Sequence, residues 1–259
     1  MGILNVTPDS FSDGGKFLHH EKAVKHALQM IEDGANIIDI GGESTRPGAA
    51  PVSAQLECDR VIPVIEAIRS ETDVPLSCDT NKAEVMSLAA AAGIDMINDV
   101  FALRGEGAEQ FVSSSGLPVC LMHMQKEPLT MQSNPNYENL IGEIRSFFKE
   151  RITTCLALGI ERNNLILDVG FGFGKTPEHN LILINRLSSF LNFDLPLLVG
   201  LSRKSTIGKI ADNRMIGSVV AAILAFERGA KILRVHDVGE TVSAVRVWRS
   251  IQAERVIDE

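Results

Sequence analysis

Short apolar runs recur along the chain, each ending in polar or glycine residues and each followed by a segment with helical periodicity. The apolar runs predict strands at 3–6, 36–40, 76–79, 96–100, 119–124, 165–168, 197–201 and 232–235. The periodic segments predict helices at 21–33, 53–71, 82–92, 107–114, 137–158, 177–190, 215–228 and 240–253. Continuous apolar strands that alternate with helices indicate a parallel sheet buried on both faces.

Strand–helix units repeated in this way over 259 residues are typical of a closed (β/α)₈ barrel. We therefore predict an α/β fold, a single-domain TIM barrel spanning residues 1–259 with long first and second βα loops. A doubly wound open sheet is the alternative, but no Gly-x-Gly-x-x-Gly turn follows the first strand. The chain starts almost within its first strand, so we also expect that a short N-terminal lead-in is missing.

The charge balance narrows the range of partners. A net charge of −8 argues against nucleic acid or an anionic membrane as the main partner. An anionic substrate must therefore be held by a local cluster of basic side chains. Small molecules are the expected partners.

Cysteine usage and hydropathy indicate the compartment. No window approaches the roughly 18 apolar residues of a membrane span, and no basic-then-apolar signal segment opens the chain. The cysteines Cys58, Cys78, Cys120 and Cys155 are scattered and form no CxxC pair. They are typical of reduced, mostly buried thiols, which predicts a cytoplasmic protein without a zinc site.

Polar or charged residues follow every predicted strand. They are Asn5, residues 43–46, Asp79, residues 98–99, His123, Asp168, residues 202–204, Arg234 and His236. The carboxyl ends of the strands form the active face of a (β/α)₈ barrel, so these residues predict a lined pocket there. A single residue of this kind would more often be a solvated loop residue.

Several of these stretches resemble the sequence blocks of the dihydropteroate synthases, in family order. The blocks are MGILNVTPDSFSDGG, GGESTRPG, CDT, INDV, MHMQ followed by TMQ, LDVGFGFGK, GLSRKS and RVHDVGET. The resemblance covers most of the chain. It implies condensation of 6-hydroxymethyl-7,8-dihydropterin diphosphate with p-aminobenzoate to give 7,8-dihydropteroate and pyrophosphate, with Mg²⁺, in an enzyme targeted by sulfonamides. Family members are commonly homodimers, so we expect a homodimer.

The resemblance implies a pterin site and a set of catalytic residues. The pterin positions are Asp79, Asn98, Met122, Asp168, Phe173, Lys204 and Arg234, and the catalytic ones are Asp79, Asp168, Lys204, Arg234 and His236. Carboxylates can accept the two adjacent N–H donors of a pterin amide edge, and Lys or Asn can donate to the opposite edge. Asp79, which precedes Thr80, could instead cap the following helix. A Gly-x-Gly-x-Gly string such as the one after Asp168 also fits phosphate loops.

Basic strand-end residues form a second set. Arg46, Arg234 and His236, together with Asn5, match the family's pyrophosphate positions. Asn5 offers an oxygen ligand for Mg²⁺, which usually shares its coordination between protein, substrate and water. The alternative is that Arg46, Arg203, Lys204, Arg234 and His236 form ion pairs with Glu43, Asp79 and Asp237.

The p-aminobenzoate side is implied by Phe11 on the first loop and by Thr45, Pro47, Ser202 and Arg203. Two residues depart from the family pattern. Val169 stands where Pro is usual, and Lys126 stands where Gly is usual. Val lacks the fixed φ of Pro and Lys lacks the freedom of Gly, so the conformation of both loops is open.

Two rival functions remain open at this stage. A barrel that transfers methyl groups from a methylated folate to a corrinoid protein would share the acidic pterin-binding residues, but would not require the Phe11 loop or the Ser-Arg-Lys run. A catalytically silent pterin-binding barrel would act as a carrier or scaffold. Retention of all the chemical positions favours the synthase over both.

Overall fold

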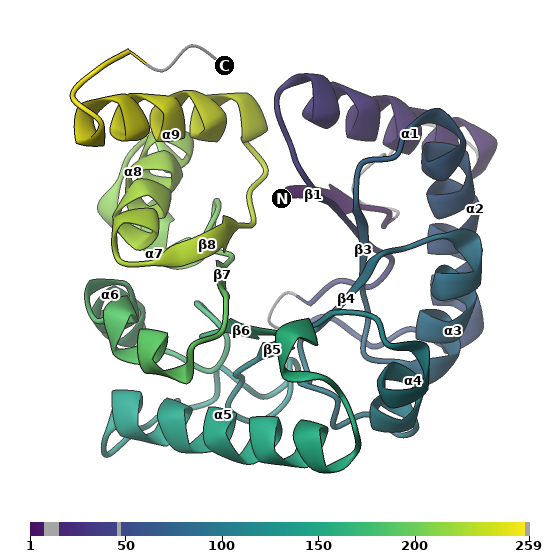
Figure 1. The fold of residues 1–259 in the computed structure, drawn as a ribbon, viewed down its shortest axis with the longest axis horizontal. Helices are drawn as coiled ribbons and strands as arrows, with labels where there is room; N and C mark the ends of the chain where they lie inside the picture. Colours follow the sequence, from purple (N-terminus) through teal and green to yellow (C-terminus); the bar gives the residue numbers. More distant parts are fainter. Residues whose placement is uncertain (8–15, 46–47, 257–259) are drawn as a thin grey trace.

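The computed structural model describes residues 1–7, 16–45 and 48–256. Within these residues, eight parallel strands form one sheet in the order β1 to β8. The strands are β1 Gly2–Asn5, β2 Ile38–Gly41, β3 Leu76–Asp79, β4 Met96–Asp99, β5 Val119–Met122, β6 Leu165–Asp168, β7 Leu197–Val199 and β8 Ala230–Leu233. Figure 1 shows the strands on the inside and the helices around them.

The sheet closes between β1 and the residues just after β8. Gly2 and Val235 form a parallel bridge. The amide of Ile3 donates to Val235 O at 3.0 Å, and the amide of Val235 donates to Met1 O at 2.9 Å. These contacts confirm the predicted (β/α)₈ barrel.

The helices alternate with the strands along the chain. Those of the described residues are α1 Lys16–Glu32, α2 Ala54–Glu71, α3 Ala83–Ala92, α4 Ala108–Ser115, α5 Leu140–Ala157, α6 Pro177–Asn185, α7 Ser205–Ile210, α8 Arg214–Glu227 and α9 Val238–Gln252. Short 3₁₀ helices, η2 Arg162–Asn164 and η3 Leu187–Phe193, flank β6 and α6. None of the helices described is both long enough and apolar enough to cross a membrane.

Several elements of the structure differ from those expected from the sequence. The helix expected at 177–190 ends at Asn185 and continues as η3, because the adjacent Ser188 and Ser189 favour turns over helix. Helix α7 was missed because its six residues are too few to show periodicity. The last strand begins at Ala230 rather than residue 232, before its more apolar half.

Alternation along the strands divides the core into layers. Residues that face the helices, such as Ile97, Leu121 and Leu167, belong to the large cluster between sheet and helices. Met96, Cys120, Ile166 and Leu198 form a separate cluster. Neighbours along a strand point to opposite faces, so this second cluster fills the barrel interior. The four cysteines are free and buried, which confirms the prediction of unpaired buried thiols.

Candidate active site at the carboxyl ends of the strands

Strand register aligns the predicted site residues at one end of the barrel. Asn5 pairs in register with Gly41, Gly41 with Asp79, and Asp79 with Asn98. On the other side of the barrel, Met122 pairs with Asp168. Polar strand ends that are far apart in the sequence therefore lie side by side, at the face where (β/α)₈ barrels bind their ligands.

Arg234 joins three strands at this end of the barrel. Its Nε donates to Asp39 Oδ2 at 2.5 Å, and its Nη2 donates to Asp79 Oδ2 at 2.7 Å. The same Asp39 oxygen accepts from Asn98 Nδ2 at 3.0 Å. Asp39, Asp79, Asn98 and Arg234 thus form one continuous network, which we call the Arg234 network.

Asp39 was not predicted as a site residue, because it lies within an apolar run rather than after one. Ile38 and Ile40 pack in the outer core, so Asp39 between them points into the barrel. Its side chain is 0% exposed. A single acidic residue inside an otherwise apolar strand was the signal that could have revealed it.

Asp79 does not cap the following helix. Lys82 occupies the cap position of α3 without a side-chain cap bond, and its amide is bonded to Thr80 Oγ1. The alternative interpretation of Asp79 was therefore wrong. Burial raises the pKa of Asp79 to about 7, although the guanidinium of Arg234 opposes this shift.

Asp168 lies at the end of β6, opposite the Arg234 network in the order of strands. It is buried, and its Oδ1 accepts from the amide of Gly170 at 2.8 Å. Burial raises the pKa of Asp168, and the nearby ammonium of Lys204 acts in the opposite direction. Gly170 has φ +68, and a Cβ there would lie 1.8 Å from His123 O. Only glycine fits this turn.

Lys204 reaches across from the loop after β7 to the loop after β6. Its Nζ donates to Phe171 O at 2.6 Å and lies 4.5 Å from the centre of the Phe173 ring. Desolvation lowers the pKa of Lys204 to about 8. Phe173 packs in a small cluster with Met122, Met124, Met131 and Val100. A cation and an apolar wall thus lie together beside Asp168.

A buried lysine, Lys175, contacts the backbone of this wall at Phe173. Lys175 Nζ lies 3.0 Å from His123 Nδ1 and donates to Phe173 O at 2.9 Å. Burial lowers the pKa of Lys175 to about 7 and that of His123 to about 2. The imidazole is therefore neutral and accepts from the lysine. Lys175 follows the glycine-rich stretch after Asp168, and no role was predicted for it from the sequence.

Ser202, Arg203 and His236 lie close together near the ends of β7 and β8. Ser202 Oγ accepts from the backbone amide of His236 at 3.2 Å and lies 3.2 Å from His236 Nδ1. Arg203 has φ +57 and bonds Asp237 through both Nε and Nη2. Asp237 thus holds a residue whose backbone conformation is unfavourable for a side chain with a Cβ.

The predicted ion pairs are partly confirmed. Arg234 pairs with Asp79, and Arg203 pairs with Asp237. Glu43 instead pairs with Lys82, which also bonds the buried Glu57. Two members of the basic cluster, Arg203 and Arg234, are therefore held by carboxylates.

Three predicted site residues, Phe11, Arg46 and Pro47, lie outside the described residues. Asn5 at the end of β1 and Thr45 in the loop after β2 are both partly buried. Of the two departures from the family pattern, Val169 is fully buried, and Lys126 has φ +63. Lys126 thus adopts the left-handed conformation that glycine would adopt without strain.

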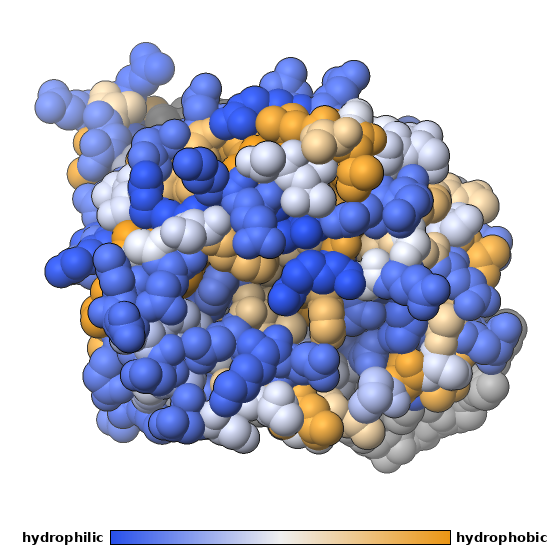
Figure 2. Space-filling model, turned by 90° about the horizontal axis from the view of Figure 1, so that it is seen from below, coloured by the Kyte–Doolittle hydropathy of each residue, from blue (hydrophilic) through white to orange (hydrophobic). Residues whose placement is uncertain are grey.

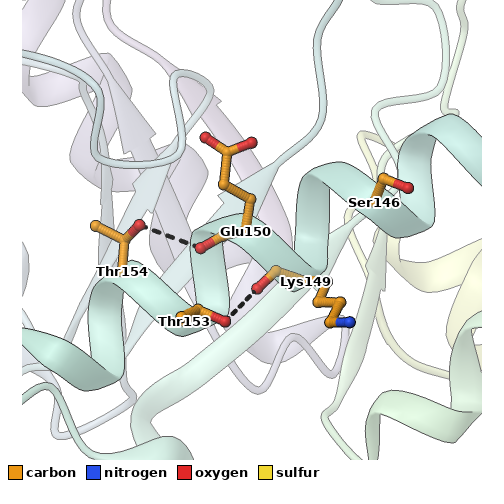
Figure 3. A pocket seen from close by; sticks show the side chains of 5 residues that line it. All are labelled: Ser146, Lys149, Glu150, Thr153 and Thr154. Atoms are coloured by element: carbon orange, nitrogen blue, oxygen red, sulfur yellow. Dashed lines mark hydrogen bonds between the residues drawn. The ribbon is translucent and has the colours of Figure 1, made fainter.

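Hollows elsewhere on the described surface lack these features. One of about 340 Å³ lies on α5 beside Ser146, Lys149, Glu150, Thr153 and Thr154. Figure 3 shows both threonine hydroxyls bonded to carbonyls of their own helix. The face seen in Figure 2, from below Figure 1, is mostly hydrophilic. A larger apolar groove of about 490 Å³ lies between α6, α7 and α8.

Comparison with known proteins assigns the family. Residues 1–236 match the family described as "Pterin binding enzyme". Dihydropteroate synthase of Haemophilus influenzae is 50% identical over 254 residues, which cover 96% of this chain and 92% of the relative.

Solved structures agree over nearly the whole chain. A Yersinia pestis dihydropteroate synthase in complex with a sulfonamide drug has a TM-score of 0.93 and 52% identity, covering 98% of this chain and 94% of that one. The Xanthomonas albilineans synthase with 4-aminobenzoic acid has a TM-score of 0.93 and 48% identity, covering 98% and 92%. The same synthase with 7,8-dihydropteroate has a TM-score of 0.90 and 46% identity, covering 98% and 93%. The chain therefore belongs to the dihydropteroate synthases, a family of pterin-binding transferases.

Proposed function

We propose that this chain condenses 6-hydroxymethyl-7,8-dihydropterin diphosphate with p-aminobenzoate, releasing pyrophosphate and forming 7,8-dihydropteroate. The observation that carries the proposal is the Arg234 network opposite Asp168 and Lys204. It combines acceptors for an amide edge with cations for a phosphate at one end of the barrel. The bound p-aminobenzoate and dihydropteroate of the Xanthomonas synthase support both the second substrate and the product.

Asp168 is the proposed partner of the pterin amide edge. One carboxylate oxygen bonds Gly170, and the carboxylate as a whole can accept further N–H donors. Asn98 and Lys204 supply donors to the remaining ring edges, and Met122 and Phe173 wall the ring. Arg234, which is anchored by two carboxylates, is the proposed cation over the ring face.

The diphosphate is assigned to Arg46, Arg234 and His236, with Asn5 as the protein ligand of Mg²⁺. The described residues contain no group of three or more His, Cys, Asp or Glu suited to a metal. A carboxamide oxygen at the end of β1 fits an ion that takes most of its ligands from phosphate and water. Bound there, Mg²⁺ would supply charge neutralisation for the departing pyrophosphate.

The p-aminobenzoate is assigned to Thr45, Ser202 and Arg203, with Phe11 and Pro47. Ser202 is buried beside His236, so this pocket adjoins the proposed phosphate site. The sulfonamide complex of the Yersinia relative supports sulfonamide binding by this chain.

In the reaction the bond between the pterin methylene carbon and the diphosphate oxygen breaks. The amine nitrogen of p-aminobenzoate bonds to that carbon and loses a proton, which the departing pyrophosphate can accept. Asp79, Asn98 and Asp168 hold an electron-rich pterin that can carry the positive charge developing on the methylene. Arg234 and His236 stabilise the negative charge that leaves, so catalysis rests on orientation and electrostatics.

The groove between α6, α7 and α8 is the proposed homodimer interface. Exposed Ile210, Ile216 and Val220 line it, and isolated monomers rarely leave contiguous apolar faces uncovered. The buried, unpaired cysteines support a cytoplasmic location.

The direct test mixes purified protein, Mg²⁺ and both substrates and detects dihydropteroate by mass spectrometry. Pyrophosphate should be released in equal amount. Release of pyrophosphate without dihydropteroate, or neither product, would contradict the proposal. Sulfamethoxazole should lower the yield, and added p-aminobenzoate should restore it.

A further inference from the structure

We propose that Asp39 is a positioning residue of the pterin site, which orients Asn98 and Arg234 for the ligand without touching it. The inference rests on the proposed function, since it concerns how that site is held. Asp39 is not among the family positions from which the site was assigned. The role of Asp39 is inferred from its contacts in the barrel interior.

A single oxygen of Asp39 holds two site residues from different strands. Oδ2 accepts from Asn98 Nδ2 on β4 at 3.0 Å and from Arg234 Nε after β8 at 2.5 Å. The side chain is fully buried, so neither bond competes with water. Charge-assisted bonds in such surroundings are stronger than neutral ones.

The contact decides which end of the Asn98 amide faces the ligand. An ionised carboxylate only accepts hydrogen bonds, so the NH₂ group of Asn98 must face Asp39. Oδ1 and the second N–H then remain for the pterin. Without Asp39 the amide could rotate by 180°, which would exchange the positions of the donor and the acceptor that face the pterin.

The contact also determines the direction of the guanidinium. The hydrogen bonds of Arg234 in the structure use Nε with Asp39 and Nη2 with Asp79. Nη1 is the remaining nitrogen of the planar fork. Two carboxylates on neighbouring strands thus hold the fork at two points, whereas one alone would allow it to swing.

A buried carboxylate at position 39 is unfavourable for stability, which indicates that Asp39 has a role in the site. Its second oxygen, Oδ1, is buried and has no hydrogen-bond partner in the described part of the chain. Buried polar atoms without partners are rare and cost free energy. An apolar residue would avoid that cost, so the carboxylate is better explained by the two residues that it holds.

Asp39 also acts on the charge of Asp79. The groups that act on Asp79 are Arg234, Asp39, Glu57 and Asp99. Arg234 lowers the pKa of Asp79, and the three carboxylates raise it. Removing the charge of Asp39 should therefore shift the titration of Asp79 to lower pH.

The test is Asp39→Asn in the full chain, measured with 6-hydroxymethylpterin by calorimetry. The expected result is about a tenfold or larger rise in Kd, because the amide of Asn98 loses its fixed orientation. The carboxyl ¹³C titration of Asp79, assigned with Asp79→Asn, should move to lower pH. A change of packing alone would not produce that shift.

The matched control is Asp95→Asn. Asp95 bonds Arg69 and the backbone of Leu76 at the other end of the barrel. This variant is expected to lower stability and to leave both the pterin Kd and the Asp79 titration unchanged. Unchanged Kd and titration in a folded Asp39→Asn variant would overturn the inference.

A measurement on the unmodified chain covers the case in which Asp39→Asn does not fold. One side-chain N–H of Asn98, assigned with Asn98→Ala, should be shifted downfield and protected from exchange. Two rapidly exchanging protons at ordinary positions would overturn the inference. If the unmodified chain does not bind the pterin at all, the proposed function fails, and the inference fails with it.

Discussion

Nζ of Lys175 lies 3.0 Å from Nδ1 of His123, so a buried lysine donates to a neutral imidazole under the glycine-rich loop. Lys175 also bonds the carbonyls of His123 and Phe173. This clamp joins the end of β5 to the loop after β6, which carries the proposed pterin wall.

Lys175→Met should change how stability depends on pH. The pKa of Lys175 falls from 10.5 to about 7 on folding, so the unfolded chain binds more protons between these values. The contribution of Lys175 to the free energy of unfolding should therefore increase as pH rises from about 7 to 10.5, by up to about 1.4 kcal/mol per pH unit. Denaturant unfolding of both proteins across this range measures the difference. Lys149 is an exposed lysine on α5, so the stability of Lys149→Met should depend on pH in the same way as that of the unmodified chain.

The rate of condensation should have a narrow pH optimum. The pKa of Asp79 is about 7, so below that pH its carboxylate becomes protonated and the pair with Arg234 weakens. The pKa of Lys204 is about 8, so above that pH its ammonium loses the proton. We expect kcat/KM to rise through pH 7 and fall above pH 8. A flat profile from pH 6 to 9 would contradict these assignments.

Asp168→Asn should weaken binding of a pterin that lacks the phosphates by about 1–3 kcal/mol, because a donor then faces a donor. The amide oxygen can still accept from Gly170, so the loop contact is retained. Calorimetry measures the loss. Asp95→Asn is the control, because Asp95 bonds Arg69 and the backbone of Leu76 at the other end of the barrel. Equal affinities for the Asp168 variant and the unmodified chain would remove Asp168 from the site.

Arg203→Ala should raise the KM for p-aminobenzoate about tenfold and leave pterin affinity nearly unchanged. The side chain of Arg203 is 54% exposed, so its pair with Asp237 should contribute little to stability. Steady-state kinetics and pterin calorimetry separate the two effects. Arg246 is an exposed arginine on α9, so Arg246→Ala should change neither the KM for p-aminobenzoate nor the pterin affinity. A parallel loss of pterin binding would mean that Arg203 supports the whole site.

Lys126→Gly should be more stable than Lys126→Ala by about 1 kcal/mol, because φ at this position is +63 and only glycine adopts it freely. Both variants lose the bond from Lys126 Nζ to Ser133 O, so their difference isolates the backbone. Chemical denaturation measures it. Equal stabilities would show that the loop relaxes out of the left-handed region.

The order of strands, the parallel sheet and the carboxyl-end location of the site follow from the sequence alone. Apolar runs and helical periodicity are local properties, and polar residues after each run identify the active face. Asp79, Asn98 and Asp168 are predicted at that face by their positions after strands, and the family resemblance implies their pterin role.

Only the tertiary structure revealed how these residues are held. Asp39 and Arg234 are 195 positions apart, and their contact exists only because the barrel closes between β1 and β8. Lys175 meets His123 because the glycine turn at Gly170 allows the two chain segments to approach. A hydrogen bond depends on the distance and direction between donor and acceptor, and strand register and barrel closure determine both. Hydrophobic periodicity along the chain contains no information about either.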